Sequence, residues 1–140
     1  MKNRVMRQLV LGAVFAATSV TGAAADDDEF LAAREAFRTG DAVKLERHAQ
    51  HLRGYVLEPY VTYWRLRMRL DQTEPAEIRA FLSAHADSTL SERLRNDWLK
   101  SLGLKKQWDL FDAEVAGLVR DDIEITCYAL QSKMRSAESE

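Results

Sequence analysis

Apolar side chains recur every three or four residues through almost the whole chain from Asp27 onward. This spacing places them on one face of an α-helix, whereas a half-buried strand would show strict alternation. Residues that interrupt helices are scarce, with two prolines and six glycines among 140 residues. The spacing therefore predicts an all-α fold. We expect seven helices, near residues 28–39, 41–53, 58–70, 74–85, 90–103, 107–119 and 123–135.

Glycine and proline mark several of the expected helix ends. Gly40 and Gly54 follow the first two helices, where a left-handed backbone commonly ends a helix. Pro59 and Pro75 fall in first turns, where a missing N–H is harmless. Because the connections are short, neighbouring helices should run antiparallel, and we expect stacked helical hairpins.

The third predicted helix is apolar on two sides, as a helix between two layers should be. Its stripes are Tyr60, Val61, Trp64 and Met68 on one side, and Tyr63, Leu66 and Leu70 on the other. Trp64 and Trp98 are 34 residues apart, which is the period of two-helix repeats. Thr89 and Glu92 should form a capping box at the start of the fifth helix. These features favour an α-solenoid segment, without a regular repeat array.

The first 25 residues have the pattern of a secretory signal peptide. Lys2, Arg4 and Arg7 precede an uncharged stretch at residues 9–20, and three alanines follow at 23–25. That stretch has 12 residues, whereas a helix that crosses a bilayer needs about 20. We therefore expect cleavage near Ala25, export to the periplasm and no stable membrane insertion.

Residues 26–140 should form one α-helical domain. Removal of the signal segment takes away three basic residues and no acid, so the formal net charge falls from −2 to −5. Such a charge disfavours nucleic-acid binding. Cys127 is the only cysteine, so the chain has no intramolecular disulfide. Its apolar neighbours indicate a buried side chain.

Three histidines and an acidic run are weak candidates for chemistry. His48 and His51 are three residues apart, but no carboxylate lies one helical turn away, which favours a structural role over a metal site. His85 should be partly buried near a helix C-terminus. The acids at 26–29 should serve the positive end of the first helix, and those at 121, 122 and 124 should serve the last helix. The sequence therefore predicts no catalytic, cofactor-binding or metal-binding residue.

Arg65 and Arg69 share one face of the third helix, and aromatic residues lie between them in sequence. Aromatic rings and guanidinium groups can stack on sugar rings and pair with carboxylates. We therefore name Arg65 and Arg69 as a possible glycan contact. The alternative is a solvated basic face, because packing accounts for most of the aromatic residues.

Three segments together resemble the N-terminal superhelical domain of soluble lytic murein transglycosylases. They are EPYVTYWRLRMRL (58–70), LRNDWLKSLG (94–103) and CYALQ (127–131), and Trp108 and Phe111 follow the second. Members of this family are periplasmic and build an α-superhelix from stacked helices. A C-terminal lysozyme-like domain then cleaves peptidoglycan glycan strands to 1,6-anhydro-muramyl products.

The resemblance implies a noncatalytic scaffold with peptidoglycan as its partner through the full-length enzyme. The family's catalytic glutamate lies in a Glu-Ser pattern followed by Gly-Leu-Met-Gln, and neither occurs in this sequence. We therefore expect a fragment or truncated product that is inactive alone and needs no cofactor. The alternative is a stand-alone periplasmic helical-repeat adaptor that binds a protein partner. The sequence leaves the oligomeric state open.

Overall fold

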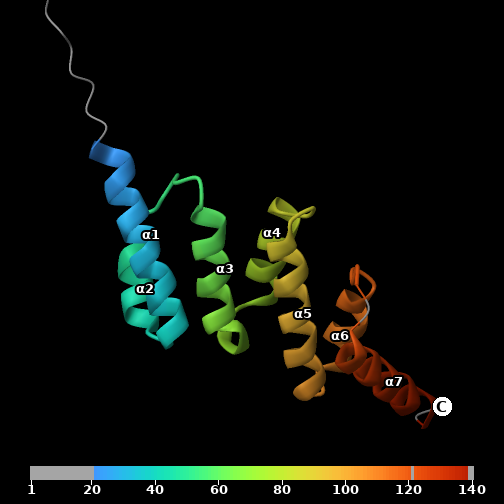
Figure 1. The fold of residues 1–140 in the computed structure, drawn as a ribbon. Helices are drawn as coiled ribbons and strands as arrows, with labels where there is room; N and C mark the ends of the chain where they lie inside the picture. Colours follow the sequence, from blue (N-terminus) through green and yellow to red (C-terminus); the bar gives the residue numbers. More distant parts are fainter. Residues whose placement is uncertain (1–20, 121, 139–140) are drawn as a thin grey trace, which may run out of the picture.

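The computed structural model describes residues 21–120 and 122–138. Within these ranges the chain forms seven α-helices and one 3-10 turn and contains no strand, so the predicted all-α fold is confirmed (Figure 1). The elements are α1 (Thr21–Thr39), α2 (Ala42–Ala49), α3 (Glu58–Met68), η1 (Leu70–Gln72), α4 (Pro75–Ala84), α5 (Thr89–Leu104), α6 (Trp108–Val115) and α7 (Ile123–Glu138).

Each predicted range overlaps one helix, but several ends differ. α1 begins at Thr21 and so includes residues 21–25 of the predicted signal segment, whose residues 1–20 lie outside the described part of the chain. α2 and α6 each end four residues earlier than expected. After both ends the backbone closes tight turns, in which His51 N–H donates to the His48 carbonyl over 3.1 Å and Gly117 N–H donates to that of Glu114 over 3.1 Å.

Left-handed residues end α1 and α5. Gly40 has φ +75°, and the Asp41 N–H donates to the Ala36 carbonyl over 2.9 Å, as predicted for a glycine after a helix. Lys106, with φ 57°, occupies the same place after α5, where the Gln107 N–H donates to the Leu102 carbonyl over 2.9 Å. A lysine thus holds a backbone conformation that normally favours glycine.

The start of α5 corrects the predicted capping box. Its N-cap is Ser88, whose hydroxyl accepts the N–H of Ser91 over 3.2 Å, so Thr89 is already the first helical residue. The one-residue shift takes Glu92 out of the position from which it could return to the cap. Pro59 and Pro75 do lie in the first turns of α3 and α4, as expected.

The helices lie side by side along an elongated molecule, with α1 and α2 at one end and α6 and α7 at the other (Figure 1). α3 contacts α1 and α2 on one side and α5 on the other, which accounts for its two apolar stripes. α5 contacts α3, α4, α6, α7 and η1. Because so many elements meet on it, α5 carries the largest set of buried residues of any helix described.

The core is continuous along these contacts. At the N-terminal end the Phe37 ring stacks on Trp64 with centroids 5.6 Å apart, and Phe30 lies 5.2 Å from the same indole. Trp64 and Trp98 are both buried, with 8% and 3% of their surface exposed, so their predicted core positions are confirmed. Phe111 of α6 is fully buried in the same core.

A buried acid adds a polar tie that the sequence did not indicate. Glu114 on α6 is 9% exposed and accepts a hydrogen bond from Arg79 of α4 over 2.7 Å. Arg95 of α5 approaches the same carboxylate at 3.4 Å. One glutamate thereby links three helices. Among the described residues, no helix combines the length and apolar character that crossing a membrane requires.

Candidate functional site

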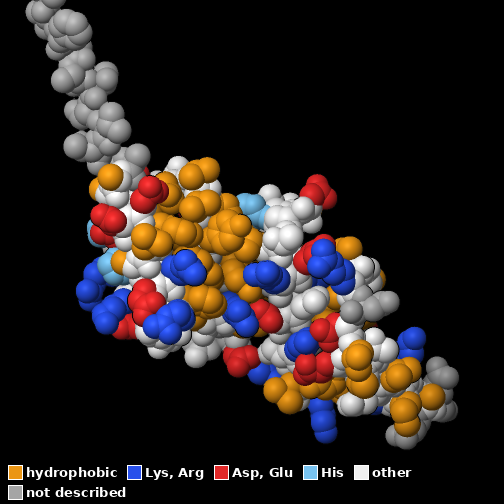
Figure 2. Space-filling view, viewed as in Figure 1, with side chains coloured by type: hydrophobic (Ala, Val, Ile, Leu, Met, Phe, Trp, Pro, Cys, Tyr) orange, Lys and Arg blue, Asp and Glu red, His pale blue; other side chains and the backbone are white. Residues whose placement is uncertain are grey.

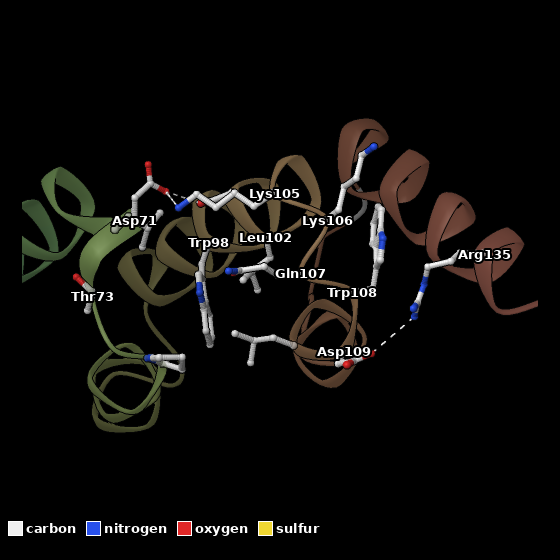
Figure 3. Close-up of a pocket in the computed structure, with 14 residues that line it drawn as sticks. Asp71, Thr73, Trp98, Leu102, Lys105, Lys106, Gln107, Trp108, Asp109 and Arg135 are labelled. Carbon is white, nitrogen blue, oxygen red and sulfur yellow. Dashed lines mark hydrogen bonds and ion pairs between the residues drawn. The ribbon is translucent and has the colours of Figure 1, made fainter. Parts of the chain in front are cut away.

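A hollow of about 470 Å³ opens between η1, the C-terminal half of α5, and the start of α6, with Arg135 of α7 at its edge (Figure 3). Trp98 and Trp108 stand on two sides of it, with Leu102 and Gln107 between them. We call this hollow the two-tryptophan groove. Its volume falls within the range of small-ligand sites, about 300–1,000 Å³.

Rigid side chains form its floor and one wall. Trp98 and Leu102 are each 3% exposed, and the Arg79 guanidinium carbon lies 6.0 Å from the Trp98 ring centroid. Trp108 is half-buried and meets the buried Phe111 ring edge-on, with centroids 6.2 Å apart. The indole of Trp108 is therefore held in place by the core while part of it stays accessible.

The rim carries three cations and two carboxylates. Lys105 pairs with Asp71 at 2.6 Å, and the Ser101 hydroxyl donates to the same carboxylate over 2.7 Å. The interaction with Lys105 is the main cause of a lowered pKa for the Asp71 carboxyl, and the hydrogen bond from Ser101 is the second cause. Arg135 lies 3.7 Å from Asp109. Lys106, beside Trp108 in Figure 3, forms no ion pair with any described residue.

This arrangement suits binding rather than acid catalysis. A general acid must be protonated near neutral pH, which requires a carboxyl with a raised pKa. Asp71 has the opposite shift, and Asp109 is fully exposed to water. The groove therefore offers aromatic surface, hydrogen-bonding groups and one cation, Lys106, that pairs with no acid in the described part of the chain.

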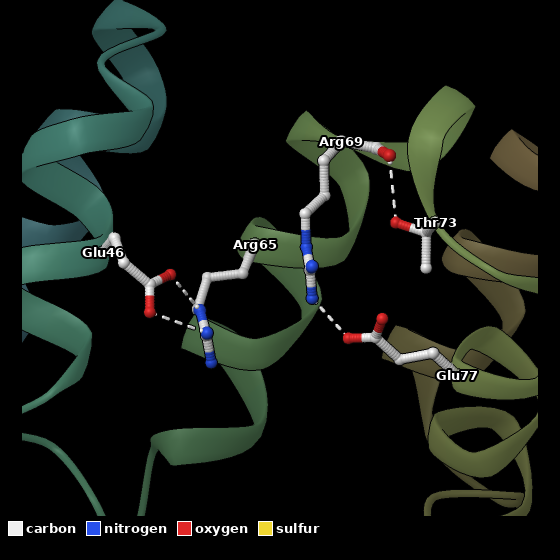
Figure 4. A network of polar contacts seen from close by, with 5 residues as sticks. All are labelled: Glu46, Arg65, Arg69, Thr73 and Glu77. Carbon is white, nitrogen blue, oxygen red and sulfur yellow. Dashed lines mark hydrogen bonds and ion pairs between the residues drawn. The ribbon is translucent and has the colours of Figure 1, made fainter.

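Of the predicted glycan contact, Arg65 lies on α3 and Arg69 is the C-cap residue that follows it, and both guanidinium groups pair with an acid from a neighbouring helix (Figure 4). Arg65 donates two hydrogen bonds to Glu46 of α2, at 2.7 and 2.8 Å. Arg69 pairs with Glu77 of α4, and its carbonyl accepts the Thr73 hydroxyl over 2.9 Å. These arginines thus link α3 to both flanking helices, and their contact with glycan stays a prediction.

His48 and His51 acquire a carboxylate that sequence spacing could not show. Glu29 of α1 places one oxygen 2.7 Å from Nδ1 of His48 and 3.4 Å from Nδ1 of His51. The hydrogen bond with His48 is the main cause of a lowered pKa for the Glu29 carboxyl. Within residues 21–120 and 122–138, no three His, Cys, Asp or Glu side chains are arranged to hold a metal ion.

His85 is half-buried at the C-cap of α4, as predicted, and its ring lies 4.6 Å from that of Phe81. Cys127 corrects the sequence prediction, because its side chain is exposed. α7 turns Ile125 and Ser132, which are seven residues apart, into the core, each 1% exposed. Residue 127 is rotated by about 200° from residue 125 on a helix and so faces solvent.

The acidic run at residues 26–29 does not lie at the start of α1, where its predicted role required it to be. Because α1 begins at Thr21, residues 26–29 lie beyond its first turn, and Asp27 instead accepts a hydrogen bond from the Tyr55 hydroxyl. Asp122 does serve the start of α7, accepting the N–H groups of Glu124 and Ile125 over 2.9 and 3.2 Å. Asp121 lies outside the described residues.

In comparisons with known proteins, no family model matches this chain, and neither do any curated protein or any solved structure.

Proposed function

We propose that this chain is the N-terminal noncatalytic scaffold segment of a soluble lytic murein transglycosylase. In its full-length form such an enzyme cleaves peptidoglycan glycan strands to 1,6-anhydro-muramyl products. The chain reaches the periplasm after cleavage near Ala25, and its helices stack as antiparallel hairpins of a superhelix. The scaffold contributes contact with peptidoglycan, not chemistry.

The observation that carries this proposal is the burial of the residues behind the family resemblance. In the segment at 58–70, Val61, Tyr63, Trp64 and Leu66 are buried, and in that at 94–103, Leu94, Trp98, Leu99 and Leu102 are buried. Both segments therefore serve contacts between helices. A scaffold requires this use of its distinctive residues.

The test uses the purified mature chain and isolated peptidoglycan sacculi. We expect the chain to sediment with sacculi and to release no 1,6-anhydromuropeptides, because a general acid needs a raised pKa and the pKa of the groove carboxyl Asp71 is lowered. Anhydromuropeptides above a mock preparation would contradict the absence of chemistry. Failure to sediment would contradict the contact with peptidoglycan.

Export is tested separately. We expect cell fractionation to place the chain in the periplasm, and mass spectrometry to find a mature N-terminus near Asp26. Retention of Met1 in the membrane fraction would contradict the proposed route.

The alternative, a helical-repeat adaptor for a protein partner, is favoured by one exposed face of α7. Ile123, Cys127, Leu130 and Met134 follow one another at spacings of four, three and four residues, and all four are exposed. Figure 2 shows apolar side chains on the surface at the α7 end of the molecule. Such spacing fits a second helix.

The coding sequence that follows residue 140 separates the two functions. Further helical repeat followed by the Glu-Ser and Gly-Leu-Met-Gln patterns would support the scaffold. Unrelated sequence would favour the adaptor.

A further inference from the structure

We propose that the two-tryptophan groove binds a saccharide that carries a single carboxylate, with the sugar ring against Trp108 and the carboxylate at Lys106. This inference rests on the proposed function, because peptidoglycan is the polymer that would present such a sugar. It assigns the contact to a different site from the face of Arg65 and Arg69.

The aromatic wall favours a sugar ring. The negative face of an indole attracts the weakly positive C–H groups on one face of a pyranose ring. Trp108 is fixed by its edge-on contact with the buried Phe111, so little freedom is lost when a ligand stacks on it. The Trp98 and Leu102 side chains close the floor, which excludes water beneath the ring.

The charges of the rim limit the ligand to one negative group. Lys105 is already paired with Asp71, whereas the Lys106 ammonium has no acid partner among the described residues. A carboxylate at Lys106 gains a charge-assisted hydrogen bond. A polyphosphate would instead meet the carboxylates of Asp71 and Asp109, which line the same groove, and like charges brought together oppose binding.

The remaining polar groups suit hydroxyl and amide substituents. Asp71 and Asp109 accept hydrogen bonds from hydroxyl groups, and the exposed Gln107 amide both donates and accepts. A fatty acid or a plain aromatic acid would form no hydrogen bond with these groups. A hydroxylated ring with one acid matches the apolar wall, the Lys106 ammonium and the polar rim together.

The experiment compares two sugars that differ in one lactyl ether group, which carries the carboxylate. N-acetylmuramic acid carries a lactyl carboxylate on the ring of N-acetylglucosamine. We expect calorimetric titration of the mature chain at pH 7 to give about fivefold tighter binding of the acid, the size of a partly exposed ion pair. Equal affinities, or no binding of either sugar, would overturn the proposal.

Two variants assign the binding to the groove. Lys106→Gly removes the ammonium, and its left-handed backbone suits glycine, so the fold is retained. We expect Lys106→Gly to abolish the preference for the acid sugar. The control Lys133→Gln removes a cation from an exposed position on α7 and should keep that preference. Trp108→Leu preserves an apolar contact to Phe111 but should weaken both sugars about tenfold. An unchanged preference in Lys106→Gly would refute the site.

Sedimentation with sacculi keeps the two proposals apart. If the chain binds sacculi but not N-acetylmuramic acid, the groove assignment fails and the proposed function stands. If it binds the soluble acid sugar but not sacculi, the groove stands and the contact with peptidoglycan fails.

Discussion

Gly103 is the residue of α5 against which the Tyr128 ring of α7 packs. A Cβ built on it would lie 2.3 Å from Cγ of that ring, well inside van der Waals contact. Gly103 lies within α5 and has no positive φ, so backbone freedom does not explain it. Its role is to make room for the tyrosine.

We expect Gly103→Ala to lower the free energy of unfolding by about 1–2 kcal/mol. The overpacked ring costs about 1–3 kcal/mol, and the better helix propensity of alanine offsets part of that. Gly117→Ala is the control, since its Cβ would meet the Arg95 guanidinium, a side-chain end that can move aside while Arg79 still holds Glu114. Urea unfolding followed by circular dichroism measures both.

A second change tests the cause of that loss. If the ring is responsible, Gly103→Ala should cost much less in a protein that already carries Tyr128→Ala, as coupled neighbours do in a double-mutant cycle. Equal losses with and without the ring would refute the steric explanation.

At the scale of single elements, α7 depends on an acid at its start. Asp122 accepts two backbone N–H groups of α7 and pairs with Lys100 of α5 at 2.8 Å. The ion pair with Lys100, and then the N–H of Ile125, lower the pKa of the Asp122 carboxyl. One side chain therefore both caps α7 and ties it to α5.

This tie should weaken in acid. A carboxyl with a depressed folded-state pKa stabilises the fold above its unfolded pKa, about 3.9, and loses that contribution as pH falls through the lower folded value. Asp122→Asn keeps an oxygen for capping but not the ion pair. We expect the free energy of unfolding of the parent to exceed that of Asp122→Asn by about 0.5–1 kcal/mol at pH 7, and this margin to shrink as pH falls below the unfolded-state pKa.

Denaturant unfolding of the parent and of Asp122→Asn from pH 7 to pH 3 measures that margin. The contributions of the other acids to the pH dependence cancel, because both proteins carry them. A margin that is as large at pH 3 as at pH 7, or one that is absent at pH 7, would contradict the role of Asp122.

At the scale of the whole molecule, α5 joins the two ends. Residues on its different faces reach α3, α4, α6 and α7, so loss of its packing should affect the entire fold. Trp64 plays a comparable part nearer the N-terminus, where two phenylalanine rings of α1 lie against it.

We expect Trp98→Ala and Trp64→Ala each to cost about 3–5 kcal/mol, because both indoles are buried. A domain of this size has about 5–15 kcal/mol in total, so each should lower the melting temperature by many degrees. Leu104→Ala, on the exposed end of α5, is the control and should change stability by about 0.5 kcal/mol or less. Thermal unfolding that leaves all three variants alike would contradict the core positions.

The sequence by itself determined the features that depend on near neighbours in the chain. Helical periodicity, the prolines of first turns and the glycine after α1 act through bonds within a few residues, and they placed seven helices and the buried tryptophans. Sequence spacing also marked α3 as two-sided, because its apolar stripes are a local property.

Tertiary structure decided whatever depends on residues distant in sequence. Glu46, Glu77 and Glu29 reach their partners Arg65, Arg69 and His48 across helix boundaries, and no spacing rule relates them. The two-tryptophan groove arises only when η1, α5 and α6 come together. The exposure of Cys127 followed from the rotation of α7 about its axis, which packing against α5 and α6 fixes and local sequence does not.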